Sequence, residues 1–182
     1  MAHAAPAWPS LGLNLPYTEG GMDGVTPRWT DIAAMATAAE LVGFDAVWVS
    51  DHVGFGNPDT GWGGAWESWT LLSALAAATS RVRLGTYVTA VPYRNPALLA
   101  KMAETLDEVS GGRVILALGA GWNKPEFDAY DFPWEQRLTA SRMACASSRP
   151  CCGPAVPITT AVSPQRTGRW SSRAVHGLRV CP

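Results

Sequence analysis

The sequence predicts an α/β fold in which helices alternate with the strands of a parallel sheet. Three observations lead to this class. Short apolar segments alternate with longer segments whose apolar residues recur every three or four positions. Glycines follow two of the helix-like segments, at Gly43 and Gly111, and polar residues follow the strand-like ones. Because this alternation has βαβ spacing, a parallel sheet is expected, and 182 residues are enough for one domain with its own core.

The first two strand–helix units are expected within the first 80 residues. Residues 11–16, LGLNLP, form a short apolar run closed by proline and predict a strand. Residues 29–41 place apolar side chains on one helical face, and Gly43 is positioned to end that helix. Residues 44–52 predict the second strand, and residues 67–80 predict the second helix. The apolar side of this second helix carries Trp69, Leu72, Leu75 and Ala76.

Two further strands and a helix are expected before residue 122. Residues 82–91 are rich in β-forming residues and predict the third strand. Residues 95–112 predict a helix in which Asn95 is the N-cap and Pro96 occupies the first helical position. Residues 113–121, RVILALGAG, predict a fourth strand closed by glycines. This periodicity does not distinguish a closed barrel from an open sheet.

The candidate site is formed by the residues that follow the strands. Right-handed crossovers place all these residues at one edge of a parallel sheet, where ligands of such folds bind. The residues concerned are Asn14, Ser50, Asp51, His52, Tyr87, Val88, Thr89 and Gly119–Asn123. A site for a small-molecule substrate is therefore expected there.

Asp51 and His52 bring a carboxylate and an imidazole together after the second strand. At a strand end both side chains can reach the mouth of the fold. Histidine exchanges protons near neutral pH, and a neighbouring carboxylate raises its basicity. The alternative is a solvated Asp-His pair in a turn, without a catalytic role.

Residues 119–126, GAGWNKPE, resemble a dinucleotide-binding fingerprint only superficially, because Pro125 stands where a helix should already be running. We interpret Gly121 as part of a glycine turn that lets the backbone approach a flat ligand. Trp122 and Asn123 are then available for stacking and hydrogen bonding. The Gly/Trp-rich residues 56–68 predict a lid over a pocket or a surface loop that packs its own tryptophans.

The charge distribution changes abruptly after Ser141. Fifteen acidic and eight basic residues precede this point, whereas six arginines and no acid follow it. Such a basic block is typical of an arm that binds nucleic acid or membrane. We attribute it to a different cause, given below, and expect neither of these partners.

Composition excludes several classes. Hydrophobic residues make up 47% of the chain and charged residues 16%, which is typical of a globular protein. No apolar run has membrane-spanning length, and the first ten residues do not resemble a secretion signal, so a cytoplasmic location is expected. Because the four cysteines lack C-x-x-C spacing, no metal site is expected. These cysteines are Cys145, Cys151, Cys152 and Cys181.

Taken in order, four segments resemble the luciferase-like monooxygenase family, and more narrowly its flavin- or F420-dependent oxidoreductases. They read LGLNLP, AAELVGFDAVWVSDH, ESWTLLSALAAATSRVRLGTYV and RNPALLAKMAETLDEVSGGRVILALGAGWNKPEF. The resemblance covers residues 10–141. It implies a (β/α)8 barrel of the TIM type with reduced FMN or F420 bound at its C-terminal mouth.

The resemblance also implies roles for individual residues. His52 matches a histidine to which proton-handling roles are assigned, which makes it the expected catalytic residue. Tyr87, Val88 and Thr89 match a strand end that often contains a non-prolyl cis peptide beneath the cofactor ring. The cofactor-binding residues implied are Asn14, Asp51, His52, Tyr87, Val88, Thr89, Gly121 and Asn123. The helices after the first strands often form a dimer contact in this family, so a homodimer through these helices is expected.

The sequence departs from the family in length, because a complete barrel needs about 250 residues. We expect residues 1–141 to be the N-terminal part of an incomplete barrel, with about four βα units. The later strands would bring most of the phosphate-binding residues.

Residues 142–182 are expected to be a disordered tail translated out of frame. When the codons after Ser141 are read one base out of register, with permissible third bases, they yield DGMRILAALLRTGRADYHGRFAAKDWPVV. That string is absent from this chain but is similar to what the family places after this helix. Resequencing of the locus tests this hypothesis, and an intact trace with the same tail in homologous loci would overturn it.

The sequence therefore predicts an oxidoreductase or monooxygenase of this class, acting with reduced F420 or FMN on a small organic substrate. Asp51 and His52 slightly favour F420. Because the barrel is incomplete, reduced or absent activity is expected. The alternative is a non-enzymatic chain, either an inactive fragment or a half barrel that dimerises without catalysis.

Overall fold

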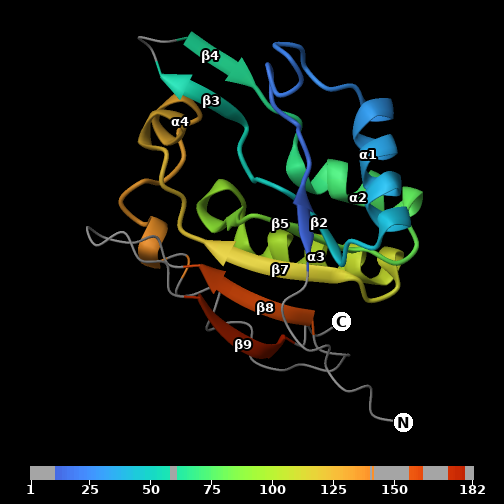
Figure 1. Ribbon diagram of the computed structural model, residues 1–182. Coiled ribbons are helices and arrows are strands. Elements are labelled where there is room, and N and C mark those ends of the chain that lie inside the picture. The colour runs from blue at the N-terminus through green and yellow to red at the C-terminus, as the bar shows by residue number, and fades with distance from the viewer. Residues whose placement is uncertain (1–10, 58–60, 140, 142–155, 162–171, 179–182) are drawn as a thin grey trace.

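The computed structural model describes residues 11–57, 61–139, 141, 156–161 and 172–178. Its centre is a sheet in the order β1-β2-β5-β7-β8-β9, in which β6 also pairs with β7 (Figure 1). The pairings from β1 to β8 are parallel, and β9 joins β8 antiparallel. The strands are β1 (Gly12–Asn14), β2 (Ala46–Val49), β5 (Arg83–Thr86), β6 (Thr89–Ala90), β7 (Val114–Gly119), β8 (Val156–Ala161) and β9 (Ser172–Leu178).

Three helices pack against the parallel strands in the order the sequence predicts. They are α1 (Trp29–Val42), α2 (Ser68–Ala78) and α3 (Pro96–Ser110). Helix α1 contacts β2, α2 contacts β5 and α3 contacts β7. The buried faces of these helices meet strand residues such as Val47, Val49 and Leu84 in one hydrophobic core. Burial of this apolar surface is the main contribution that holds the layers together.

The helix ends confirm the predicted signals. Gly43 ends α1 in the left-handed conformation, with φ of 93°, which a residue with a Cβ adopts only with strain. The side chain of Asn95 caps α3, where its Oδ1 accepts the backbone N–H of Ala97 at 2.9 Å. Gly111 ends α3 with φ of 69°. These local signals fix where the crossovers begin and end.

The structure differs from the expectation for residues 56–68. Instead of an irregular loop, β3 (Gly54–Asn57) and β4 (Gly61–Gly64) form an antiparallel hairpin beyond β2. Glycine is common in these strands, and a Cβ on Gly56 would lie 2.0 Å from the carbonyl oxygen of Gly61. The two strands therefore approach so closely that only glycine fits at this position.

Two other segments also differ. The third predicted strand is divided into β5 and β6, and the peptide bond between Tyr87 and Val88 is cis, as the resemblance implied. A short helix, α4 (Lys124–Ala129), begins where Pro125 was taken to argue against a helix. Proline is tolerated in a first helical turn, because the N–H it lacks would have no helical partner there.

Strands β8 and β9 fall within the segment that was expected to be disordered, so the expectation and the structure differ at these residues. The rest of the segment after Ser141, including all four cysteines, lies outside the described residues. Within the described part, no helix combines the length and the apolar character needed to cross a membrane.

Candidate active site

The predicted residues do meet at one edge of the sheet, where the parallel strands end. Strand β1 ends at Asn14, β2 at Val49, β5 at Thr86 and β7 at Gly119. Two groups of polar side chains form here. One surrounds the carboxylate of Asp51, and the other surrounds a second carboxylate, that of Glu126.

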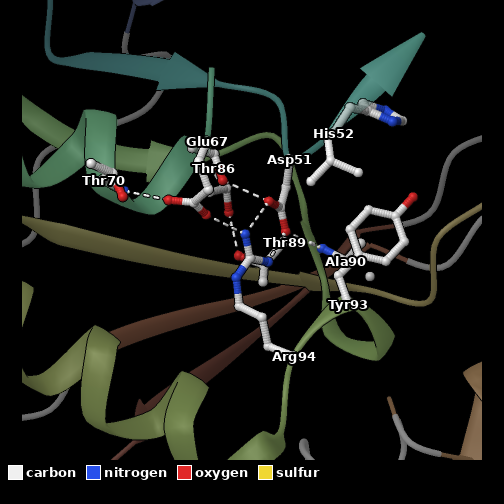
Figure 2. Close-up of polar contacts among 12 residues, drawn as sticks. Asp51, His52, Glu67, Thr70, Thr86, Thr89, Ala90, Tyr93 and Arg94 are labelled. Atoms are coloured by element: carbon white, nitrogen blue, oxygen red, sulfur yellow. Dashed lines mark hydrogen bonds and ion pairs between the residues drawn. The ribbon is translucent and has the colours of Figure 1, made fainter. Parts of the chain in front are cut away.

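Asp51 lies at the centre of a buried hydrogen-bonded ion pair (Figure 2). It is 3% exposed, and its oxygens accept from the Ser68 hydroxyl at 2.6 Å and the Ala90 N–H at 2.8 Å. The guanidinium of Arg94 donates to both oxygens, at 2.7 and 2.8 Å. Both oxygens of Asp51 are therefore engaged within the protein. The side chain joins the end of β2 to α2 and β6, and its task is structural because almost none of its surface is accessible to a ligand.

Arg94 also binds Glu67, at 2.6 Å. Burial alone would lower the pKa of the Arg94 guanidinium, but its hydrogen bonds and charge interactions with Asp51 and Glu67 raise it. The cation is therefore held charged between two acids. A buried charge is tolerated only when it is paired in this way.

The side chains of the segment from Tyr87 to Thr89 differ in their exposure to solvent. Tyr87 is 62% exposed, whereas Thr89 is completely buried. The hydroxyl of Thr89 forms a short hydrogen bond with that of Thr86, across the cis peptide. Of these residues, Tyr87 alone presents a large side chain at the surface, with Val88 half-buried beside it.

His52 points away from the Asp51 group (Figure 2). It forms a pair with Glu126. Its Nδ1 lies 2.6 Å from Glu126 Oε2. The imidazole ring packs against Phe55, with ring centroids 4.2 Å apart, and against Trp122 at 5.8 Å. Trp122 is 64% exposed, so an aromatic surface accessible to solvent adjoins the imidazole.

Glu126 is completely buried and is the residue that sequence reasoning missed. Burial would raise the pKa of its carboxyl, but hydrogen bonds from His52, Tyr93 and the Val53 N–H hold the pKa below its ordinary value. Burial and the bond to Glu126 raise the pKa of the Tyr93 hydroxyl, which therefore stays protonated as a donor. The arrangement places a carboxylate anion behind an imidazole, a combination suited to proton transfer.

A hollow of about 380 Å³ is lined in part by Phe55, whose ring packs against the imidazole of His52. Of the predicted site residues, Asn14 and Ser50 are in its wall. The other wall residues include Tyr17, Glu19 and Phe55. Phe55 thus separates the hollow from the imidazole, since it contacts both.

Two predicted residues have structural tasks. A Cβ on Gly121, whose φ is 75°, would lie 2.6 Å from the ring of Phe127, so this glycine serves close packing of the turn. Asn123 is 7% exposed, and its Nδ2 lies 3.4 Å from Glu126 Oε2. It therefore faces the Glu126 group and not solvent. Among the described residues, no cluster of His, Cys, Asp and Glu could hold a metal ion.

The comparisons with known proteins agree on one family. Residues 10–144 match the family model of the luciferase-like monooxygenases. A 5,10-methylenetetrahydromethanopterin reductase from Methanolobus tindarius is 41% identical over 118 residues, which are 65% of this chain and 33% of that protein. A pyrimidine monooxygenase RutA from Agrobacterium fabrum is 43% identical over 96 residues, 52% of this chain and 26% of that protein. The chain thus spans a third or less of the length of these curated relatives.

Solved structures of the same class superpose on the chain. The F420-dependent tetrahydromethanopterin reductase from Methanopyrus kandleri has a TM-score of 0.52 at 30% identity, over 69% of this chain and 30% of that one. The monooxygenase RslO1 from Streptomyces bottropensis has a TM-score of 0.63 at 20% identity, over 95% of this chain and 49% of that one, and this likeness concerns the fold alone. Together with the parallel sheet, these neighbours confirm the expected fold class, a portion of a TIM-type barrel.

Proposed function

Because the chain belongs to the luciferase-like monooxygenase family, we propose that it forms part of the active site of an oxidoreductase that uses F420 or FMN on a small organic substrate. One observation carries the proposal. An imidazole, that of His52, stands at the carboxyl ends of parallel strands in contact with the rings of Phe55 and Trp122, and Phe55 also lines a hollow. Ligand sites of barrel enzymes occupy this edge of the sheet.

The described residues fit the ring of such a cofactor. Tyr87 and Trp122 offer exposed aromatic surface, and the hollow is lined by the amide of Asn14 and the hydroxyl of Ser50. A flat heteroaromatic ring needs apolar faces and a few polar contacts at its edge. The cations described at this edge, Arg94 and Lys124, are both engaged by carboxylates, so a phosphate anchor would have to come from other residues.

His52 is the residue that we assign to proton transfer. When bound, F420 or FMN supplies or accepts the hydride, and FMN also allows reaction with oxygen. The proton that leaves or joins a neighbouring heteroatom of the substrate would be taken or delivered by the imidazole. Asp51 and Arg94 would hold the strand ends in place, because their ion pair joins β2 to the segment after β6.

The choice between the two cofactors rests on the relatives. The structurally similar reductase from M. kandleri is named for F420, and we favour F420 for this reason. FMN remains the second option, because the resemblance of the sequence extends to flavin-dependent members and the RutA relatives are monooxygenases.

A binding titration tests the proposal. The purified chain is titrated with F420 and with FMN, each oxidised and reduced, while ligand fluorescence and the melting curve are followed. A ligand present at 100-fold its Kd stabilises the fold by about 2.7 kcal/mol, so a clear rise in Tm is expected. NADH serves as a control ligand without effect. Absence of binding, together with absence of a cooperative melting transition, would support the inactive fragment instead.

A second candidate is a homodimer that forms through α1 without catalysis. Leu41 and Val42 at the end of α1 are 77% and 74% exposed. An apolar hollow of about 390 Å³ lies between this helix and the edge strand β1, lined by Leu13, Met35 and Phe44 among others. Contiguous exposed apolar surface favours contact with another protein surface, and a second copy of this chain offers the same apolar surface in return.

A further inference from the structure

The side chain of Glu126 connects His52 and the two residues that follow it to Tyr93 and Asn123. It lies in α4, 74 residues from His52, and its carboxylate has no exposed surface. Oε1 accepts the backbone N–H groups of Val53 at 2.6 Å and Gly54 at 3.3 Å. A buried carboxylate is stable only when such donors replace the water it has lost.

The second oxygen, Oε2, faces three side chains. The Tyr93 hydroxyl donates to it at 2.7 Å, and Asn123 Nδ2 lies at 3.4 Å. The third neighbour is His52 Nδ1, at 2.6 Å. The backbone N–H groups of Val53 and Gly54 and the side-chain NH₂ of Asn123 can only donate hydrogen bonds. Both oxygens of the Glu126 carboxylate are therefore acceptors in these contacts.

This set of donors decides which nitrogen of His52 carries the proton when the ring is neutral. Because the carboxylate is an acceptor, Nδ1 must be the donor in the 2.6 Å contact. The neutral ring then keeps its lone pair on Nε2. No hydrogen-bond partner of Nε2 occurs among the residues that the structure describes, and the ring adjoins the exposed indole of Trp122.

We propose that Glu126 is a positioning residue that fixes His52 as the Nδ1–H tautomer and so presents Nε2 as the atom that exchanges the proton with substrate. The proposal rests on the proposed function for the identity of the proton partner. The tautomer itself follows from the geometry of the chain without any ligand. Asp51 does not compete for Nδ1, because Ser68, Ala90 and Arg94 occupy its oxygens.

Glu126→Gln provides a sharp test, because an amide has one oxygen and one NH₂ group. The two backbone N–H groups cannot become acceptors, so the amide oxygen stays on the side of Val53 and Gly54. The NH₂ group then faces His52 Nδ1 and donates to it. The proton of the neutral imidazole must move to Nε2, and the tautomer is inverted.

The measurement is the ¹⁵N NMR spectrum of ¹⁵N-histidine in the full chain above the titration of the ring. The chain has three histidines, and the signals of His52 are those lost in His52→Asn. We expect a protonated Nδ1 and an unprotonated Nε2 in the wild type, and the reverse in Glu126→Gln. Asp128→Asn is the matched control, because Asp128 lies in the same helix, is 60% exposed and pairs with Lys124. In this variant His52 should keep the wild-type tautomer.

Tyr93→Phe tests whether the tautomer of His52 depends on the Glu126 carboxylate itself or on the hydrogen bond that Tyr93 donates to it. It removes one donor to Oε2 but leaves the carboxylate and the aromatic packing, so the wild-type tautomer is expected. A wild-type spectrum with a protonated Nε2, or with both tautomers averaged, overturns the proposal even if no variant folds. A folded Glu126→Gln chain with Nδ1 still protonated overturns it as well.

A turnover assay separates this proposal from the proposed function. Where turnover is measured, Glu126→Gln should lose about 10²- to 10⁴-fold in kcat, the usual contribution of a general acid–base group, while cofactor affinity is retained. If F420 and FMN fail to bind but the Nδ1–H tautomer is present, the proposed function fails and the positioning by Glu126 stands.

Discussion

At the scale of single residues, Asp51 and His52 are adjacent in the chain but perform different tasks. The sequence predicted both as neighbours of the cofactor ring. In the structure Asp51 is tied to Arg94 and the Ala90 N–H (Figure 2). His52 instead contacts Glu126 and the rings of Phe55 and Trp122. This division could not be predicted, because the partners that decide it lie 17 to 74 residues away along the chain.

The carboxylate of Glu40, which lies outside the candidate active site, offers a pH-dependent test of stability. It lies in α1 and accepts the backbone N–H groups of Ser80, Arg81 and Val82 at 3.0, 2.6 and 2.9 Å. Burial would raise the pKa of this carboxyl, but these hydrogen bonds lower it to about 2. The carboxylate thereby fastens α1 to the turn that leads into β5.

The depressed pKa of Glu40 sets the sign of the pH dependence. The stabilisation that it contributes is fully present above the ordinary pKa of 4.5 and is lost as the pH falls toward about 2. Glu40→Gln should lower the free energy of unfolding at pH 7 by about 2 kcal/mol, a typical value for hydrogen bonds to a charged group, and by much less at pH 2. Urea unfolding at several pH values measures this. Glu108→Gln, at an exposed position of α3, is the control, and an equal loss at both pH values would contradict the account.

At the scale of helices and strands, local signals predicted what depends on neighbouring residues. Asn95 caps α3 and Gly43 ends α1, as expected, because a cap acts within one turn of the helix. The β3–β4 hairpin was missed, because its glycines and tryptophans do not show the alternation of apolar and polar residues by which strands are recognised. Its pairing depends on the close approach of Gly56 and Gly61, which composition does not reveal.

The exposed apolar end of α1 leads to a prediction about association. If two copies pair through this helix, Leu41→Glu places a charge at the contact and should convert a dimer into a monomer. Sedimentation velocity at several concentrations measures the change. Leu138→Glu, at another exposed apolar position, is the control and should leave the association unchanged. A wild-type chain that sediments as a monomer at all concentrations would contradict the dimer.

At the scale of the whole molecule, the parallel pairings β1–β2, β2–β5 and β5–β7 agree with the βα units that the sequence predicted. The alternation of strand and helix was sufficient for this, because each unit packs mainly against its neighbours. The closure of the sheet into a barrel came from the resemblance alone, since periodicity is the same in open and closed sheets.

The boundary near residue 141 stays a prediction. The family match ends at residue 144, close to the point where the acidic residues cease. Beyond it, β8 continues the parallel sheet and β9 reverses the direction, a pairing that an all-parallel barrel does not contain. We propose on these grounds that residues after about 141 do not continue the family's sequence.

The central claim is that a cofactor ring of the F420 or FMN type lies against His52. The most direct measurement is the ¹⁵N NMR signal of His52 Nε2 during titration of the chain with each cofactor. We expect this signal to shift as the cofactor saturates the chain and raises Tm, while the signals of the other two histidines stay in place. A cofactor that raises Tm and leaves the His52 signal unmoved would contradict the claim, and so would a chain that binds neither cofactor.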